Sequence, residues 1–230
     1  KQKELYHAHA QRLALMLQNQ TEEEFADSRF QVLSELTRLR QLCCDPALVY
    51  ENYEGGSAKL DLCIELIQSA VESGHKILLF SQFTSMIEIL TARLQEESIS
   101  YFVLQGSTKK EQRAQMVEQF NRDDTSVFCI SLKAGGTGLN LTGADIVIHY
   151  DPWWNVAVEN QATDRAHRIG QKNVVTVYKL IAKGTIEEKI IKLQQMKKEL
   201  AEEILSGITY YLSFPEEVYA APQREAELVA

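Results

Sequence analysis

Two arginines stand close together in the stretch QATDRAHRIGQ. Arg165 and Arg168 are three residues apart, and a glutamine lies at each end of the stretch. Residues at this spacing project from one face of a helix, so the two guanidinium groups repel each other unless something anionic balances them. A phosphate would do so, because guanidinium forks match phosphate oxygens and stay charged. Such arginines stabilise the charge that develops during phosphoryl transfer.

The same pair also has a plain structural interpretation. Carboxylates close by in the sequence could balance the charge, as on many solvated or salt-bridged helix surfaces; they are Asp151, Glu159 and Asp164. The spacing of the two arginines does not decide between this interpretation and a phosphate clamp.

A glycine-rich segment, SLKAGGTGLN, covers residues 131–140 after an apolar run. Its glycines would let backbone amides approach a phosphate or a sugar closely. The spacing does not match the dinucleotide-binding G-x-G-x-x-G pattern, and the G-x-x-x-x-G-K-[ST] phosphate-binding loop occurs nowhere in the chain. The segment is therefore either a ligand-contacting loop or a tight turn between a strand and the next element.

The chain has only two tryptophans, and they are adjacent in the segment DPWWN, residues 151–155. Neighbouring side chains at a strand end point in opposite directions, so we expect one ring to pack in the core and the other to be exposed. An exposed tryptophan can stack on a base or a sugar. The alternative is that both rings close off the core.

Short apolar runs alternate with helical patterns from residue 58 onward. The strands are expected over 76–80, 101–104, 126–132, 145–150 and 174–180, and the helices over 58–74, 84–97, 109–120, 156–170 and 184–205. This alternation predicts an α/β fold, a three-layer sandwich around a parallel sheet. Ligands gather at the carboxyl ends of such strands, which makes four loops the candidate site: 80–84, 104–108, 131–140 and 150–155.

Two helices precede this region, over residues 4–18 and 22–42. Thr21 and Glu24 have the spacing of a capping box, and Asp45-Pro46 should end the second helix. Residues 51–57, ENYEGGS, have the composition of a linker. The last residues, 206–230, show no clear period, and both a docking segment and a loose tail are compatible with their sequence.

The composition of the 230 residues, 45% hydrophobic and 24% charged, is typical of a soluble globular protein. No apolar run predicts a membrane span or a signal peptide, and the absence of an initial Met suggests a piece of a longer chain. The four cysteines lack disulfide or zinc-site spacing, so we expect an intracellular protein. The net charge of −8 argues against a free-standing DNA-binding module, although a local basic groove remains compatible with it.

Five segments together are far more specific than any one of them: FSQFTSM, LQGSTKKEQR, SLKAGGTGLNLTGAD, YDPWWN and QATDRAHRIGQ. Their order and separation closely resemble the second ATPase lobe of the Swi/Snf-type family of DNA-translocating ATPases, within helicase superfamily two. The resemblance covers about residues 36–205. The segment LCCDPALVYENY is more similar to the bacterial branch. The family often has proline after WWN, where this chain has Val156, which leaves only the local loop shape in question.

The resemblance implies a RecA-like parallel sheet, a P-loop NTPase-type helicase lobe with an N-terminal helical extension. Residues 1–57 would be part of the family's helical protrusion and a linker, and 58–183 the lobe itself. The helix over 184–205 resembles the brace that reaches back to the first lobe, and 206–230 form a tail of uncertain structure.

The resemblance also implies roles for individual residues. The catalytic residues would be the two arginines facing the ATP phosphates, Arg165 and Arg168. The other nucleotide-binding residues would be Gly136, Gly138, Asn140 and Gln161. The DNA-binding residues would be Ser81, Gln82, Gly106, Ser107, Thr108, Ser131, Lys133 and Trp154.

ATP with Mg²⁺ is the expected ligand, held mainly by a first lobe that carries the phosphate-binding loop and a D-E-x-H motif. Neither motif occurs in this chain, so the sequence predicts no metal site and no ATP hydrolysis without that lobe. The expected partners are double-stranded DNA, the first lobe and nucleoprotein complexes, without a membrane. The expected location is the bacterial cytoplasm, or the nucleus in a eukaryote. The alternatives are a non-catalytic protein-interaction module with a degenerate helicase-like fold and a stand-alone nucleotide sensor.

Overall fold

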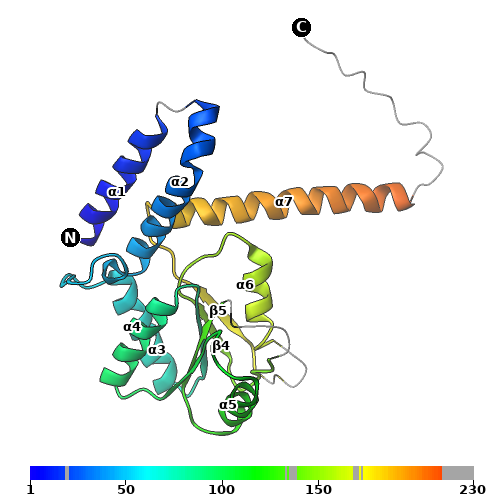
Figure 1. The fold of residues 1–230 in the computed structure, drawn as a ribbon. Helices are drawn as coiled ribbons and strands as arrows, with labels where there is room; N and C mark the ends of the chain where they lie inside the picture. The colour runs from blue at the N-terminus through cyan, green and yellow to red at the C-terminus, as the bar shows by residue number, and fades with distance from the viewer. Residues whose placement is uncertain (19–20, 133, 135–138, 168–170, 172, 214–230) are drawn as a thin grey trace. The chain divides into compact units, whose positions relative to one another are not determined.

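The structure, a computed structural model, describes residues 1–18, 21–132, 134, 139–167, 171 and 173–213 (Figure 1). The chain divides into two compact units, Lys1–Ile191 and Lys192–Ala230. The first unit holds the sheet, its covering helices and the N-terminal helices. The described part of the second unit is the continuation of the last helix, α7, which spans Ile186–Ser213.

The sheet has five strands, all parallel, in the order β2-β3-β1-β4-β5. The strands are β1 (Ile77–Ser81), β2 (Tyr101–Leu104), β3 (Val127–Ser131), β4 (Ile146–His149) and β5 (Thr176–Lys179). The three central strands are buried along their whole length, as expected for a parallel sheet covered on both faces. Each predicted strand is present, within two residues of its expected ends.

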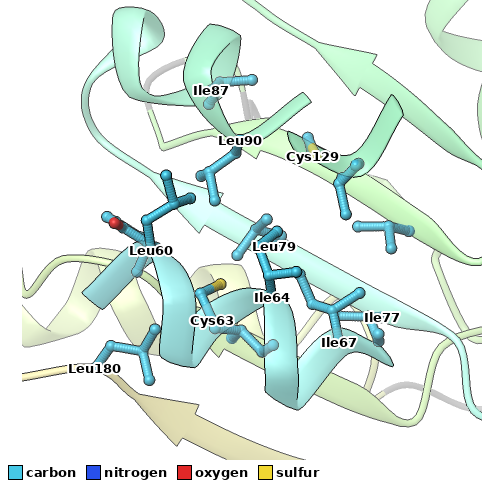
Figure 2. Packing of buried hydrophobic residues seen from close by; sticks show 14 of the residues in the cluster. Leu60, Cys63, Ile64, Ile67, Ile77, Leu79, Ile87, Leu90, Cys129 and Leu180 are labelled. Atoms are coloured by element: carbon cyan, nitrogen blue, oxygen red, sulfur yellow. The ribbon is translucent and has the colours of Figure 1, made fainter. Parts of the chain in front are cut away.

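Helices cover both faces of the sheet, which confirms the predicted three-layer α/β architecture (Figure 1). Alternate residues of β1 serve the two layers, because successive side chains of a strand point to opposite faces. Ile77 and Leu79 pack against α3 (Ala58–Glu72) and α4 (Thr84–Glu96), as Figure 2 shows. Leu78 and Phe80 face the layer of α5 (Lys110–Arg122) and α6 (Val156–Thr163).

The N-terminal extension is a helical hairpin of α1 (Gln2–Leu17) and α2 (Glu22–Cys44). The predicted capping box is present, because the Glu24 amide donates to Thr21 Oγ1 over 3.3 Å and the Thr21 amide donates to Glu24 Oε2 over 2.8 Å. Asp45 ends α2 and accepts a hydrogen bond from the Ala47 amide, 2.8 Å away. Both predicted ends of α2 are therefore confirmed.

A small apolar cluster of its own holds the hairpin together, built on Leu13, Val32 and Leu39. The first residue of α7, Ile186, packs against this cluster, and its amide donates to Tyr6 Oη over 2.7 Å. A buried ion pair lies next to it, between Lys59 of α3 and Glu187 of α7. The hairpin, the sheet layer of α3 and the start of α7 thus meet at one place in the first unit. Within the described ranges, no helix combines the length and apolar character of a membrane span.

Candidate functional site

Four loops follow the carboxyl ends of β1, β2, β3 and β4, and they contain the predicted site segments. Ser81 and Ser131 are the last residues of their strands and lie opposite each other in the β1–β3 register. Because all strands are parallel, these ends share one edge of the sheet, which is where open α/β sheets bind ligands.

Ser81 is fully buried, and its hydroxyl binds within the protein. Ser81 Oγ donates to Asp151 Oδ1 over 2.6 Å, and the same oxygen accepts the Gln82 amide over 3.3 Å. Asp151 is also buried, and burial raises its pKa to about 6. The pair therefore fastens the tryptophan loop to the end of β1. The neighbouring Gln82 is half-buried, and its Nε2 is buried without a hydrogen-bond partner among the described residues.

The turn after β2 is held by one side chain, that of Arg113 on α5. Its Nε donates to the Thr108 carbonyl over 2.8 Å, and its Nη2 donates to the carbonyls of Gln105 and Gly106 over 3.3 and 3.1 Å. Its Nη1 donates to the Ala134 carbonyl over 3.0 Å, in the glycine-rich segment. Arg113 thus fixes the turn and ties it to the next loop. Gly106 and Ser107 are exposed there, and Thr108 is half-buried.

Part of the glycine-rich segment lies outside the described residues, including the predicted ligand residues Lys133, Gly136 and Gly138. The residues on either side of this part are described. Ser131 is buried, and its Oγ accepts the Ala134 amide over 3.2 Å.

The end of that segment is held by Asn121 of α5. Asn121 Nδ2 donates to the carbonyl of the exposed Asn140 over 2.8 Å, and its Oδ1 accepts the Gly143 amide over 2.9 Å. A Cβ at Gly143 would lie 3.0 Å from the Asn121 Cα, so the close approach favours glycine. The sequence carries no signal that marks Asn121 for this task.

The arginine segment is not one continuous helix, and the expectation of a helix over 156–170 is wrong. The helix α6 ends at Thr163, and residues 164–167 form a turn that carries Arg165. Two carbonyls of this turn accept bonds from groups outside it. The Leu141 amide donates to the Arg165 carbonyl over 3.0 Å, and Gln171 Nε2 donates to the Ala166 carbonyl over 3.2 Å.

Gln171 makes two further bonds, to the carbonyls of Thr142 and Ala144 over 3.2 and 2.7 Å. The arginine turn is therefore connected by hydrogen bonds to the residues that follow the glycine-rich segment. Arg168 lies outside the described residues, so the predicted side-by-side placement of the two arginines is not described by the structure.

The Arg165 side chain is 4% exposed, and its guanidinium carbon lies 5.5 Å from the centre of the Phe80 ring. An aromatic face is a favourable neighbour for a guanidinium group at this distance. The other predicted residue of this segment, Gln161, is exposed on α6. Arg165 is thus held against Phe80, the residue of β1 that directly precedes Ser81.

Both tryptophans are half-buried, so neither is the core residue or the fully exposed residue that strand alternation predicts. Trp153 packs against the apolar cluster under α5 and α6, and its amide donates to Glu159 Oε1 over 2.7 Å. The Arg40 guanidinium lies over both rings. This shared cation explains the departure, because it gives each ring a partner outside the core.

The burial of His149, the last residue of β4, can be tested by measuring how stability depends on pH. It is 1% exposed, stacks on the Phe80 ring at 5.5 Å, and its Nε2 lies 3.0 Å from Thr163 Oγ1. Burial lowers its pKa to about 4. In the unfolded chain His149 binds a proton near pH 6.5, whereas in the folded chain it stays neutral down to about pH 4. The free energy of unfolding should therefore fall by about 3 kcal/mol as the pH drops from about 6.5 to about 4.

A His149→Gln variant should lose this acid sensitivity, because glutamine can still bond to Thr163 and does not titrate. Urea unfolding of both proteins at pH 7.5 and pH 5 measures the difference. The pKa of Asp151 is raised, so its contribution to stability increases as the pH falls, opposite to that of His149. Asp151 is present in both proteins, so its contribution cancels when the two are compared. Equal losses of stability in the two proteins would contradict the prediction.

The described residues include no group of three or more histidine, cysteine, aspartate or glutamate side chains arranged to hold a metal ion. The chemistry that this edge of the sheet offers is instead that of anion contact. It consists of backbone amides, hydroxyl and amide side chains, the guanidinium groups of Arg40, Arg113 and Arg165, and two tryptophans.

The sequence and the fold of the chain are similar to those of known proteins. Residues 58–170 match the helicase conserved C-terminal domain family. A protein named as an uncharacterized ATP-dependent helicase of Mycoplasma pneumoniae is 46% identical over 182 residues, which is 77% of this chain and 17% of that protein. The chain spans only 17 to 20% of the length of its bacterial helicase relatives.

Two solved structures are similar over most of the chain. The Sulfolobus solfataricus SWI2/SNF2 ATPase core in complex with double-stranded DNA has a TM-score of 0.73 at 34% identity, over 90% of this chain and 43% of that one. The Sulfolobus solfataricus SWI2/SNF2 ATPase C-terminal domain has a TM-score of 0.70 at 32% identity, over 88% of this chain and 83% of that domain. With both the sequence and the fold in agreement, the chain belongs to the SWI2/SNF2-type ATP-dependent helicases and is the C-terminal helicase domain of such a protein.

Proposed function

We propose that this domain is half of a double-stranded DNA translocase, which supplies arginine contacts to ATP and backbone contacts to DNA. The observation that supports the proposal most directly is that hydrogen bonds connect three segments at one edge of the sheet: the turn after β2, the glycine-rich segment and the arginine turn. Arg113 binds the turn after β2 to Ala134, and the Leu141 amide binds the Arg165 carbonyl. A ligand at any one of these loops is thereby linked to the other two.

On the nucleotide side, Arg165 is the described residue best suited to a phosphate. Its guanidinium is fixed beside Phe80, and a fixed fork loses little freedom when it binds an oxyanion. Asn140 and Gln161 are exposed and able to reach a nucleotide. The assignments of Arg168, Gly136 and Gly138 rest on the family resemblance alone. ATP is the substrate, and its Mg²⁺ would be held by the first lobe.

On the DNA side, the proposed contacts are the groups near solvent at the same edge: Gln82, Gly106, Ser107, Thr108 and Trp154. The hydroxyls of Ser81 and Ser131 bond inside the protein, so we assign them to positioning these loops. Lys133 is assigned by resemblance. Contacts of this kind go to phosphates, which makes binding insensitive to sequence and sensitive to salt. The related Sulfolobus core was solved with double-stranded DNA, which supports this choice of ligand.

Hydrolysis needs the first lobe, because the phosphate-binding loop and an acidic Mg²⁺ motif do not occur in this chain. ATP would lie between the lobes, with Arg165 approaching from this side. Closing and opening of the two lobes around each ATP would then move the domain along one strand of the duplex, without a need to separate the strands.

The test combines this chain with the first lobe of a relative such as the Sulfolobus SWI2/SNF2 ATPase. We expect no ATP hydrolysis by either lobe alone and DNA-stimulated hydrolysis by the mixture or by a covalent fusion of the two. DNA affinity should fall steeply between 50 and 200 mM salt, by on the order of 10³-fold or more if six phosphates are neutralised.

Three results would contradict the proposal in different ways. ATP turnover by the purified chain alone would refute its dependence on a first lobe. A fused protein that folds and binds DNA without hydrolysis would favour a non-catalytic interaction module. Tight ATP binding by the isolated chain would favour a nucleotide sensor.

A further inference from the structure

Arg40, near the end of α2, lies between three aromatic rings. Its guanidinium carbon is 5.3 Å from the centre of the Trp153 ring, 5.6 Å from that of Trp154 and 5.6 Å from that of Phe83. Each distance is within the range of a cation–π contact. The residue is only 5% exposed, so these contacts are largely shielded from water.

The polar contacts of Arg40 lead to the same loop. Its Nη2 donates to the Pro152 carbonyl over 2.7 Å and lies 3.7 Å from Asp151 Oδ2. Its Nε is buried and has no hydrogen-bond acceptor among the described residues. The neighbours of the guanidinium group on this side are aromatic rings. The Arg40 guanidinium therefore contacts the tryptophan loop in two ways. Its edge bonds to Pro152 and faces Asp151, and its flat faces lie against the two tryptophan rings.

The same network reaches the end of β1. Asp151, the partner of Arg40, accepts hydrogen bonds from Ser81 and from the Gln82 amide, and Phe83 follows directly. One side chain from the N-terminal hairpin thus sits at the junction of two loops that the proposed function assigns to DNA. This residue lies 112 positions from Pro152 in the sequence and outside the part of the chain that matches the helicase domain family.

Space filling alone does not account for an arginine here. Burying a guanidinium group costs free energy, and apolar side chains of similar size often serve equally well or better. What arginine adds is direction, because a planar fork donates to one carbonyl while its faces stack on rings. A lysine could keep the charge beside Asp151 but could not do both of these.

We propose that Arg40 is the positioning residue of the tryptophan loop: it sets the orientation of Trp153 and Trp154 and links the placement of α2 to the DNA-facing edge. The link to DNA rests on the proposed function. The orientation of the rings does not, because it is a property of the folded chain and can be measured without a ligand.

The chain is well suited to that measurement, because Trp153 and Trp154 are its only tryptophans and report all of its tryptophan fluorescence. Arg40→Met should increase quenching by acrylamide and shift the emission to longer wavelength in the folded protein. Arg40→Lys should show the same change in part, since the charge remains and the stacking plane is lost. Arg38→Met is the matched control, because Arg38 lies on the same helix in a partly exposed pair with Glu35.

The functional arm uses the two-lobe assembly. The DNA concentration that gives half-maximal ATPase activity should rise about tenfold in Arg40→Met, as expected when one aromatic stacking contact is lost, while the maximal rate stays the same. A general loss of structure would instead lower the maximal rate. Arg38→Met should change neither quantity.

The outcomes separate the two proposals. If the unchanged protein shows no DNA-stimulated hydrolysis, the proposed function fails, and the fluorescence result still decides the role of Arg40. If quenching and emission in Arg40→Met and Arg40→Lys equal those of the unchanged protein, the positioning role is refuted. Should Arg40→Met fail to fold because Asp151 is left uncompensated, Arg40→Lys decides by the same two readouts.

Discussion

Replacing Arg165 with alanine should abolish most DNA-stimulated ATP hydrolysis by the two-lobe assembly, with a loss of about 10³-fold or more in rate. The reason is electrostatic. Charge develops on the phosphate oxygens during transfer, and in the proposed function the Arg165 guanidinium, already held against Phe80, would stabilise that charge without rearranging. Steady-state ATPase assays with saturating DNA measure the effect, and binding of DNA to the isolated domain should change little.

Two further proteins make this result interpretable. Arg122→Ala removes a guanidinium group from the exposed surface of α5, where it pairs with Glu118, and should leave the rate unchanged. Arg165→Lys keeps a positive charge without the planar fork and should recover only a part of the rate. If Arg165→Ala keeps the native unfolding temperature and hydrolyses ATP at the native rate, the assignment of this arginine is wrong.

The largest effect on stability should come from Lys59→Met. Lys59 Nζ lies 2.6 and 2.5 Å from the two carboxylate oxygens of Glu187, and the two residues are 8% and 0% exposed. Removal of the lysine leaves a buried carboxylate without its counter-charge, which costs about 3 to 5 kcal/mol. For a chain of this size the unfolding temperature should fall by roughly 10 °C, as measured by calorimetry or circular dichroism.

A double-mutant cycle shows whether the charge itself is responsible. Lys59→Met combined with Glu187→Gln should recover a substantial part of the lost stability, because no bare charge then remains buried. Glutamine can still accept the Ala182 amide, which donates to Glu187 Oε2 over 2.7 Å. Lys110→Met, on the exposed surface of α5, should change stability by no more than about 0.5 kcal/mol. A loss in the double variant as large as in Lys59→Met would assign the effect to packing.

The layers of this fold are predictable from the sequence because each strand is a short apolar run covered on both faces. KILLF and SVFCISL have no polar alternation, which is the pattern of a buried parallel strand. The capping box at Thr21 and the stop at Asp45-Pro46 are equally local signals, and both are confirmed. The family, in turn, is predictable from five short segments in a fixed order.

The contacts that hold the site together are not predictable in this way. Arg40 and Pro152, Arg113 and Ala134, and Gln171 and Thr142 are far apart in the sequence, and each bond joins a side chain to a backbone carbonyl. Any side chain with a donor of the right length could serve, so no residue pattern marks them.

The end of α6 illustrates the same limit. Residues 156–170 contain no proline, and their only glycine is the last residue, so helical propensity alone extends the helix through Arg165. The helix ends at Thr163, and the carbonyls of Arg165 and Ala166 accept bonds from Leu141, just after the glycine-rich segment, and from Gln171. The contact with Leu141 comes from a loop 24 positions away, so the residues of the segment carry no signal for it.

That early helix end has a mechanical consequence. The Arg165 backbone is held from two sides, because its amide donates to the Ala162 carbonyl of α6 over 3.4 Å and its carbonyl accepts a bond from the loop that follows the glycine-rich segment. Since that carbonyl accepts the Leu141 amide, a shift of the neighbouring loop by a fraction of an ångström is transmitted to the arginine backbone directly. In the proposed function, this bond and the bonds of Gln171 would link the nucleotide side to the DNA side, and by reciprocity each ligand would change the binding free energy of the other by the same amount.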